Sequence, residues 1–214
     1  MTQYHSQCGQ DQFIRETFFP NKIDGVFVDV GAYDGQTFSN TLAFERLGWR
    51  GLCVEPLPDA FRKLKDTRHA ICENVAAANF DGLVLFTEAD CPINGKMLSG
   101  LSHHMDVSRI DGLPKNEYRV RALSLSQLLS RHALTHVDFM SIDVEGSELL
   151  VLKGLDFDRF DVSVLAIEDN RAGPEIPTFM HDKGYTLVTR LEQDYVFSKI
   201  PMPGGPPPIW GSNR

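Results

Sequence analysis

Apolar runs and helical patterns alternate along the chain from residue 25 onwards. Three short apolar runs, each bounded by turn residues, are expected to be strands: 25–30, 50–56 and 69–77. Between them, Phe38 and Leu42 have the i, i+4 spacing of a packed helix, and Pro58 is expected to begin a second helix. The order β-α-β-α-β predicts a parallel sheet with right-handed crossovers.

The second half of the chain continues this alternation. Further strands are expected at 83–90, 117–123, 136–143, 162–169, 185–190 and 195–200. The last two are expected to pair in antiparallel fashion. Ser124 and Gln127 form a capping-box pattern that predicts a helix start, Gly154 is expected to end a helix over 147–153, and Pro174 to begin another that Gly184 ends.

A loop and a tail interrupt this regular pattern. Residues 91–116 are rich in Gly, Pro, Asn, Ser and His, and a loop of this length inside a compact domain is usually functional or disordered. Residues 201–214 contain too many prolines for a helix or a central strand. The chain of 214 residues is therefore expected to form one α/β domain over 1–200, with a substrate-side loop and an extended tail.

Composition and charge exclude several classes of function. The formal net charge of −8 and the lack of a Lys/Arg cluster disfavour nucleic acid as a partner. No apolar run has the roughly 18 residues that a membrane helix needs, and the N-terminus lacks the apolar core of a signal peptide. Cys8, Cys53, Cys72 and Cys91 are scattered, which is typical of free thiols in a reducing compartment. We expect a cytoplasmic protein.

The first predicted strand ends in a glycine turn, "FVDVGAYDG". Gly31 and Gly35 would let a ligand approach the backbone closely, with Ala32 between them. The spacing is not the G-x-G-x-x-G of a nicotinamide-dinucleotide site. Asp29 and Asp34 would repel a pyrophosphate. They suit a ligand whose end is cationic, such as one with an amino group and a sulfonium.

An acid follows the second predicted strand. Glu55 lies about 20 residues after the glycine turn, where an acid can accept hydrogen bonds from ribose hydroxyls. The third predicted strand brings two further polar residues beside the expected adenine pocket. Either Glu73 or Asn74 could contact the adenine amino group. These positions together predict a nucleoside-binding edge of the sheet.

Several segments, in order, resemble the FkbM family of S-adenosylmethionine-dependent methyltransferases. They are "SQCGQD", "FVDVGAYDGQTFSNT", "GLCVEP", "SIDVEGSELLVLKG", "AIEDN" and "DYVF", between residues 6 and 197. The resemblance implies a class I methyltransferase (Rossmann-like) doubly wound sheet of seven strands, mostly parallel with one reversed strand. It also implies O-methylation of a sugar or natural-product hydroxyl. The implied cofactor-side residues are Asp29, Gly31, Gly35, Glu55 and Asp143. The resemblance also makes Gln10 and Asp11 candidate site residues, and a simple helix cap is the other interpretation of this pair.

Oxygen ligands gather where two predicted strands end. Asp143 follows one strand, and Asp169 and Asn170 follow the next, which is the type of ligand set that Mg²⁺ takes along with waters. Glu168 competes with Asp169, because strand alternation points only one of the two inward. In the other interpretation, Asp143 only bonds the cofactor or the backbone at the Gly146 turn.

An alcohol nucleophile requires a base or a metal ion before it can attack a methyl group. His103 and His104 in the long loop are candidate bases, or they are surface residues. Glu145 either faces the substrate or caps the next helix. Glu148 lies in the first turn of that helix, where a carboxylate meets the positive helix end, so a structural role is expected.

The sequence therefore predicts an O-methyltransferase that uses S-adenosylmethionine, acts on a hydroxyl of a small molecule and could use Mg²⁺. The alternative is a noncatalytic binding module that keeps the same fold. Retention of Gly31, Gly35, Glu55 and Asp143 favours the enzyme. An NAD-dependent oxidoreductase is disfavoured because the dinucleotide glycine motif is missing.

Overall fold

The computed structural model describes residues 2–90, 98–105 and 107–202. Its main sheet has seven strands, in the order β10 (Thr186–Leu191), β11 (Asp194–Ser198), β9 (Asp161–Glu168), β8 (His136–Ile142), β1 (Val26–Val30), β2 (Arg50–Val54) and β3 (Ile71–Glu73). The chain winds outward from β1 to β3, and then returns to the other side of β1 with β8. The strand order therefore reverses between β1 and β8, where open α/β sheets bind their ligands.

Strand directions agree in part with the expected sheet. The pairs β1–β2, β2–β3, β1–β8 and β8–β9 are parallel, and β11 is antiparallel to both β9 and β10. The expected parallel sheet with one reversed strand is thus present, and so is the expected antiparallel pair at the end of the chain. The sequence did not predict that four more strands form a separate sheet.

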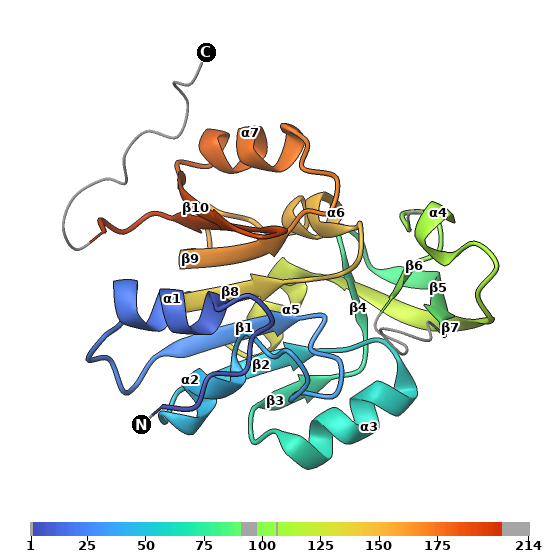
Figure 1. The fold of residues 1–214 in the computed structure, drawn as a ribbon, viewed down its shortest axis with the longest axis horizontal. Helices are drawn as coiled ribbons and strands as arrows, with labels where there is room; N and C mark the ends of the chain where they lie inside the picture. The colour runs from blue at the N-terminus through green and yellow to red at the C-terminus, as the bar shows by residue number, and fades with distance from the viewer. Residues whose placement is uncertain (1, 91–97, 106, 203–214) are drawn as a thin grey trace.

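This second sheet lies beside the main one, at the right of Figure 1. Its order is β4 (Ala76–Ala78), β7 (Lys115–Ser124), β5 (Gly82–Ala89) and β6 (Ser99–Leu101). The single strand expected at 69–77 is therefore wrong, because its two halves belong to different sheets. Asn74 lies at the break, where its side-chain amide donates hydrogen bonds to the carbonyls of Glu55 (2.8 Å) and Pro56 (3.0 Å).

The expected loop at 91–116 is partly regular. Its described residues include β6 and a short helix, α4 (Val107–Ile110), while 91–97 lie outside the described part. The carbonyl of His104 accepts a hydrogen bond from Arg171 Nη2 at 3.1 Å, which ties this segment to the loop after β9. The expected tail lies largely outside the described residues, which end at 202.

Helices cover both faces of the main sheet. One face packs against α1 (Gln10–Phe18), α2 (Leu42–Arg46) and α3 (Pro58–Thr67), and the other against α5 (Leu125–Arg131), α6 (Glu148–Leu152) and α7 (Glu175–Asp182). Alternation along β1 serves both cores: Val28 and Val30 face the second group of helices, and Phe27 faces the first. Ser124 and Gln127 form the predicted capping box of α5.

The helix expected from Phe38 begins later than predicted. Phe38 has a φ of 54° and is 47% exposed, and α2 starts only at Leu42. Polar contacts of Asp34 and Arg68 hold 34–41 as a loop instead, so the i, i+4 spacing was coincidental. Cys8, Cys53 and Cys72 are free thiols, and Cys91 lies outside the described residues. Every helix in the described part is too short or too polar to span a bilayer.

Candidate functional site

The site is built around the glycine turn that ends β1. Gly31 has a φ of 89°, and a Cβ atom placed on it would lie 1.7 Å from the carbonyl oxygen of Asp143, the residue after β8. Gly35 has a φ of 78°, and its Cβ would collide with the side chains of Leu64 and Arg68. Both glycines are therefore required by conformation and by space. The turn brings the ends of β1 and β8 into direct contact at the reversal of strand order.

The two aspartates of this turn stabilise the turn itself. Asp34 Oδ1 accepts hydrogen bonds from the backbone N–H groups of Gln36 (3.0 Å) and Thr37 (2.8 Å), and Asp34 lines none of the cavities described below. Asp29 is 5% exposed and accepts a hydrogen bond from the hydroxyl of Thr41 at 2.5 Å. The expectation that both carboxylates face a cationic ligand is not supported for Asp34.

Arg68, which no sequence pattern singled out, holds this loop in place through hydrogen bonds and an ion pair. Its side chain is fully buried, lies 3.7 Å from Asp29 Oδ2 and donates to Glu45 Oε2 at 2.9 Å. It also donates hydrogen bonds to the Thr41 hydroxyl (2.9 Å) and to the carbonyl of Gly35 (3.3 Å). One buried cation thus connects β1, the glycine loop and α2.

Glu55 lies at the end of β2, as predicted, and lines a cavity of about 70 Å³. Its carboxylate accepts hydrogen bonds from the backbone N–H groups of Tyr33 (2.9 Å) and Leu57 (2.8 Å). Burial raises the pKa of Glu55 to about 7, although these two N–H donors act in the opposite direction. The other cavity walls near Glu55 come from Val75, Ala76 and other small or apolar side chains. The cavity thus combines mainly apolar walls with the buried carboxylate of Glu55.

Asn74 is not part of this cavity wall, because its amide is engaged with the two carbonyls of the β2–α3 turn. Glu73 points elsewhere and contacts Arg131 (3.0 Å) and His132 (2.8 Å). The structure therefore gives Asn74 a role in shaping the turn around Glu55, and neither residue lines the cavity where adenine was expected.

A second cavity, of about 50 Å³, lies on the other side of the Gly31 turn. Gln10, at the start of α1, donates to Asp194 Oδ2 at 2.7 Å, and both residues line this cavity. Asn40 Oδ1 is buried there and has no hydrogen-bond partner within the described part of the chain. Asp194 was not selected from the sequence, although it begins the "DYVF" segment. Several acceptors thus surround this cavity, as an ammonium group would require.

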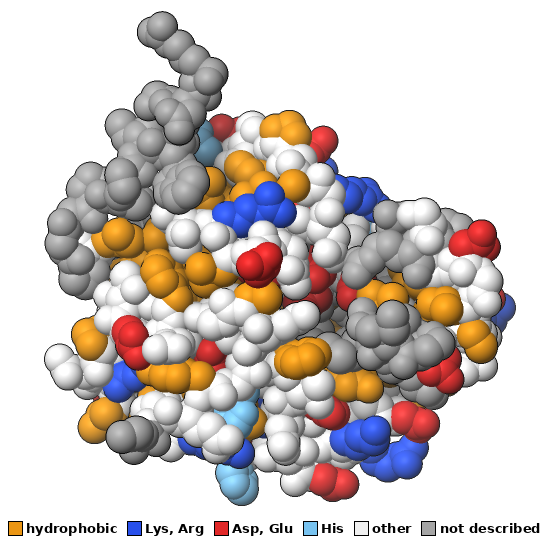
Figure 2. All heavy atoms as spheres, in the orientation of Figure 1, with side chains coloured by type: hydrophobic (Ala, Val, Ile, Leu, Met, Phe, Trp, Pro, Cys, Tyr) orange, Lys and Arg blue, Asp and Glu red, His pale blue; other side chains and the backbone are white. Residues whose placement is uncertain are grey.

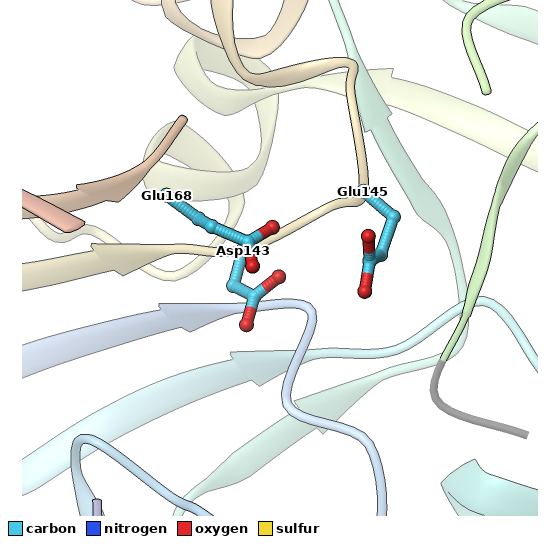
Figure 3. A group of neighbouring side chains, drawn as sticks. All are labelled: Asp143, Glu145 and Glu168. Atoms are coloured by element: carbon cyan, nitrogen blue, oxygen red, sulfur yellow. The ribbon is translucent and has the colours of Figure 1, made fainter. Parts of the chain in front are cut away.

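Asp143 lines both cavities and belongs to a group of three acidic residues. Asp143 follows β8, Glu168 ends β9 and Glu145 lies in the turn between β8 and α6, with one carboxylate oxygen of each within 4.8 Å of the others. Figure 3 shows the three carboxyl groups pointing toward a common space, and Figure 2 shows acidic side chains in a recess near the centre of this face. We call Asp143, Glu145 and Glu168 the carboxylate cluster.

Burial and proximity raise the proton affinity of this cluster. Burial and the charges of Glu168 and Glu145 raise the pKa of Asp143. Burial and the charge of Glu145 raise the pKa of Glu168 to about 8. The cluster therefore binds a proton near neutral pH unless another cation lies beside it.

Asp169 and Asn170 lie apart from the cluster. Asp169 Oδ1 accepts hydrogen bonds from the backbone N–H groups of Arg171 (3.0 Å) and Ala172 (3.1 Å). Asp169 and Asn170 line a third cavity, of about 520 Å³, between the starts of α6 and α7, which Glu145 of the cluster also borders but Asp143 and Glu168 do not. Of the two acids that compete at the end of β9, Glu168 is the one beside Asp143. The structure therefore favours Glu168 over Asp169 as the neighbour of Asp143, and the ligand set Asp143, Asp169 and Asn170 stays a prediction.

The remaining predicted residues are also placed. His103 and His104 are exposed and line none of the three cavities described here, so the carboxylate cluster is better placed than either histidine to accept a proton. Glu148 accepts hydrogen bonds from the backbone N–H groups of Val144 (3.2 Å) and Gly146 (2.9 Å), which is the structural role expected for it. Ala32 is buried and donates its N–H to Val54.

Comparisons with known proteins give the following matches. A family model described as the methyltransferase FkbM domain matches residues 29–187. Similar solved structures include Aeropyrum pernix fibrillarin with natively bound S-adenosyl-L-methionine, at 16% identity over 90% of this chain and 73% of that chain, with a TM-score of 0.47.

Two further structures are more distant in TM-score. One is a fibrillarin/Nop5p complex, at 15% identity over 83% of this chain and 72% of that chain, with a TM-score of 0.43. The other is a SAM-dependent methyltransferase from Aquifex aeolicus, at 14% identity over 88% of this chain and 91% of that chain, with a TM-score of 0.35. A comparison with curated proteins finds no match. The stretch matched by the family model contains the Gly31 turn, Glu55 and the carboxylate cluster.

Proposed function

The chain belongs to the FkbM methyltransferase family, and we propose that it transfers a methyl group from S-adenosylmethionine to a hydroxyl oxygen of a small molecule, such as a sugar or a secondary metabolite. The observation that carries this proposal is the pair of cavities on either side of the Gly31 turn. Glu55 lies in one of them, Asn40 and Asp194 lie in the other, and Asp143 lies in both.

One orientation of the cofactor places its adenosine in the first cavity and its ammonium group in the second. Its adenosine would occupy the cavity at the end of β2, with the ribose hydroxyls donating to Glu55 and the adenine against Val75 and Ala76. Its ammonium would occupy the polar cavity and donate to Asn40 Oδ1, which otherwise lacks a partner within the described residues. The sulfonium would then lie near Asp143, where the two cavities meet.

The carboxylate cluster is placed to act on the acceptor. The acceptor oxygen attacks the sulfonium methyl in line, the new C–O bond forms as the C–S bond breaks, and S-adenosylhomocysteine leaves. The hydroxyl proton must go to a base as this happens. When no metal ion is bound, an ionised carboxylate of this cluster takes the proton, because burial and neighbouring charges raise its proton affinity. Assistance by Mg²⁺ is part of the proposal, because oxygen ligands surround this point.

Transfer itself is tested with cofactor labelled at its methyl group and a panel of hydroxyl-bearing acceptors. Label that appears in a sugar or natural-product hydroxyl supports O-methylation. The alternative is a noncatalytic module with the same fold, which would bind S-adenosylhomocysteine in calorimetry and turn over no acceptor. Label in an amine or on a carbon atom would support methyl transfer but would contradict transfer to oxygen.

Replacement of Glu55 by alanine is expected to weaken cofactor binding. A hydrogen bond to a charged group contributes about 1.5–3 kcal/mol, so the affinity for S-adenosylhomocysteine should fall about tenfold or more. Titration calorimetry measures this loss. Glu73→Ala is the matched control, because Glu73 pairs with Arg131 and His132 outside the cavity, and its affinity should stay unchanged. Equal affinities of folded Glu55→Ala and the parent protein would exclude Glu55 from the ribose site.

Cofactor affinity is also expected to depend on the ionisation of Glu55. Its pKa in the free protein is about 7, and ribose hydroxyls donate to the ionised carboxylate, so binding should lower this pKa and release a proton. Affinity should therefore fall as the pH drops below about 7. Calorimetry in two buffers of different ionisation enthalpy counts the proton, and Glu55→Gln should abolish its release. An affinity independent of pH across this range would contradict the assignment.

The raised pKa of Glu55 also makes the stability of the free protein depend on pH, but stability falls as the pH rises whereas cofactor affinity increases. The folded protein holds a proton on Glu55 more tightly than the unfolded chain, whose carboxyl has a pKa of 4.5. The contribution of Glu55 to stability is therefore lost as the pH rises from 4.5 to about 7. Bound cofactor should offset this loss, because its hydroxyls stabilise the ionised form.

A further inference from the structure

The carboxylate cluster is formed by two neighbouring strands and a constrained turn. In the parallel pair β8–β9, Ile142 lies opposite Ile167, so that the next residues, Asp143 and Glu168, come together at the same edge. Glu145 has a φ of 55°, in the left-handed region that side chains rarely adopt, and Gly146 follows with a φ of 108°. This unusual backbone directs a third carboxylate toward the first two (Figure 3).

Two of the three acids have no cationic partner in the protein. Neither Asp143 nor Glu168 forms a salt bridge with any Lys, Arg or His in the described part of the chain. The charges that act most strongly on both groups are those of other acids, including Glu145 and Asp194. Buried carboxylates are normally paired with a cation or bound to a metal. The cluster is therefore suited to bind a cation from outside the chain, in place of the proton that it otherwise holds near neutral pH.

A second observation comes from one atom. Glu168 is 6% exposed, and its Oε2 atom is buried without a hydrogen-bond partner among residues 2–90, 98–105 and 107–202. Buried polar atoms without partners are rare in folded proteins, and each one calls for an explanation. A cation between the strand ends would satisfy this atom and relieve the repulsion within the cluster.

We propose that Asp143, Glu145 and Glu168 bind one divalent cation of the Mg²⁺ or Mn²⁺ type. The ligands are all carboxylate oxygens, which these hard cations prefer, whereas Zn²⁺ more often takes His and Cys. Such ions usually keep several waters, so positions remain for an acceptor oxygen. The catalytic use of the ion rests on the proposed methyl transfer, but its binding does not.

Binding is tested on the metal-free protein by titration with Mn²⁺, with the electron paramagnetic resonance signal of free Mn²⁺ as the readout. We expect one saturable site per chain and competition by Mg²⁺. Glu168→Gln keeps the shape of the side chain and removes its charge, so the affinity for Mn²⁺ should fall about tenfold or more. Without metal and above about pH 8, where Glu168 is ionised, this variant should be at least as stable as the parent protein, because it removes repulsion and the desolvation of a charge.

Asp169→Asn is the matched control, since Asp169 is adjacent in sequence and its Oδ1 serves backbone N–H groups outside the cluster. Its Mn²⁺ affinity should equal that of the parent protein. Loss of binding in Asp169→Asn with retention in Glu168→Gln would overturn the proposal in favour of the set Asp143, Asp169 and Asn170. Absence of saturable binding in the parent protein would overturn it altogether. Calorimetry with S-adenosylhomocysteine separates either result from failure of the proposed function.

Discussion

Replacing Gly31 with alanine is expected to abolish cofactor binding and to destabilise the protein strongly. The new Cβ would lie 1.7 Å from the carbonyl oxygen of Asp143, and the φ of 89° is unfavourable for any L side chain. The conformation costs roughly 1–2 kcal/mol. The clash adds roughly 1–3 kcal/mol, because backbone at the end of β8 must move. Separation of β1 from β8 would also displace Asp143 from both cavities.

Chemical denaturation and calorimetry with S-adenosylhomocysteine measure the two effects of Gly31→Ala. Gly184→Ala is a suitable control, since Gly184 has a similar φ of 81° but nothing lies within 4 Å of its Cβ position. Gly184→Ala should be destabilised only by the conformational cost and should keep the full affinity for S-adenosylhomocysteine. Similar losses in the two variants would indicate that the contact between Gly31 and Asp143 is not important.

The position of the site was predictable because parallel strands end at one edge of a sheet. Gly31, Glu55 and Asp143 follow three strands that the apolar runs identified, so their proximity followed from topology alone. The choice between Glu168 and Asp169 did not follow, because the alternation of a strand is known only when its last paired residue is known. The pairing of Ser198 to Val164 and of Asp194 to Glu168 extends β9 to Glu168 and turns Asp169 away.

Other features depended on contacts that sequence patterns do not reveal. The run at 69–77 is mainly apolar and is interrupted at Glu73 and Asn74, but only the strand pairing shows that it divides between two sheets there. Arg68 is one of many single basic residues near the end of a helix. Its partners, Asp29 and Glu45, come from two other elements, so nothing local distinguishes it from an exposed arginine. Long-range polar networks of this kind are determined by the tertiary structure.

Arg68→Met is therefore expected to have a large effect on stability. It removes the cation that contacts both Asp29 and Glu45 and leaves both carboxylates buried, with side chains that are 7% and 9% exposed. Loss of one partner from a buried ion pair typically costs about 3–5 kcal/mol. Arg62→Met is the matched control on α3, because the salt bridge between Arg62 and Asp59 is exposed, with side chains that are 75% and 64% accessible. Such a pair contributes about 0–1 kcal/mol.

The pH dependence separates lost charge from lost packing in Arg68→Met. Burial already raises the pKa of Asp29 in the folded protein, and Arg68 opposes this effect. Without Arg68 the folded-state pKa rises further above 3.8, so the variant loses stability as the pH increases through and above that value. The loss of unfolding free energy relative to the parent protein is measured by urea denaturation. It should be largest near neutral pH and should shrink on acidification toward 3.8, as Asp29 becomes protonated in the folded state of both proteins. A deficit that is the same at every pH would mean that stacking of the Arg68 guanidinium on the ring of Phe27 stabilises the loop more than its pairing with Asp29 does.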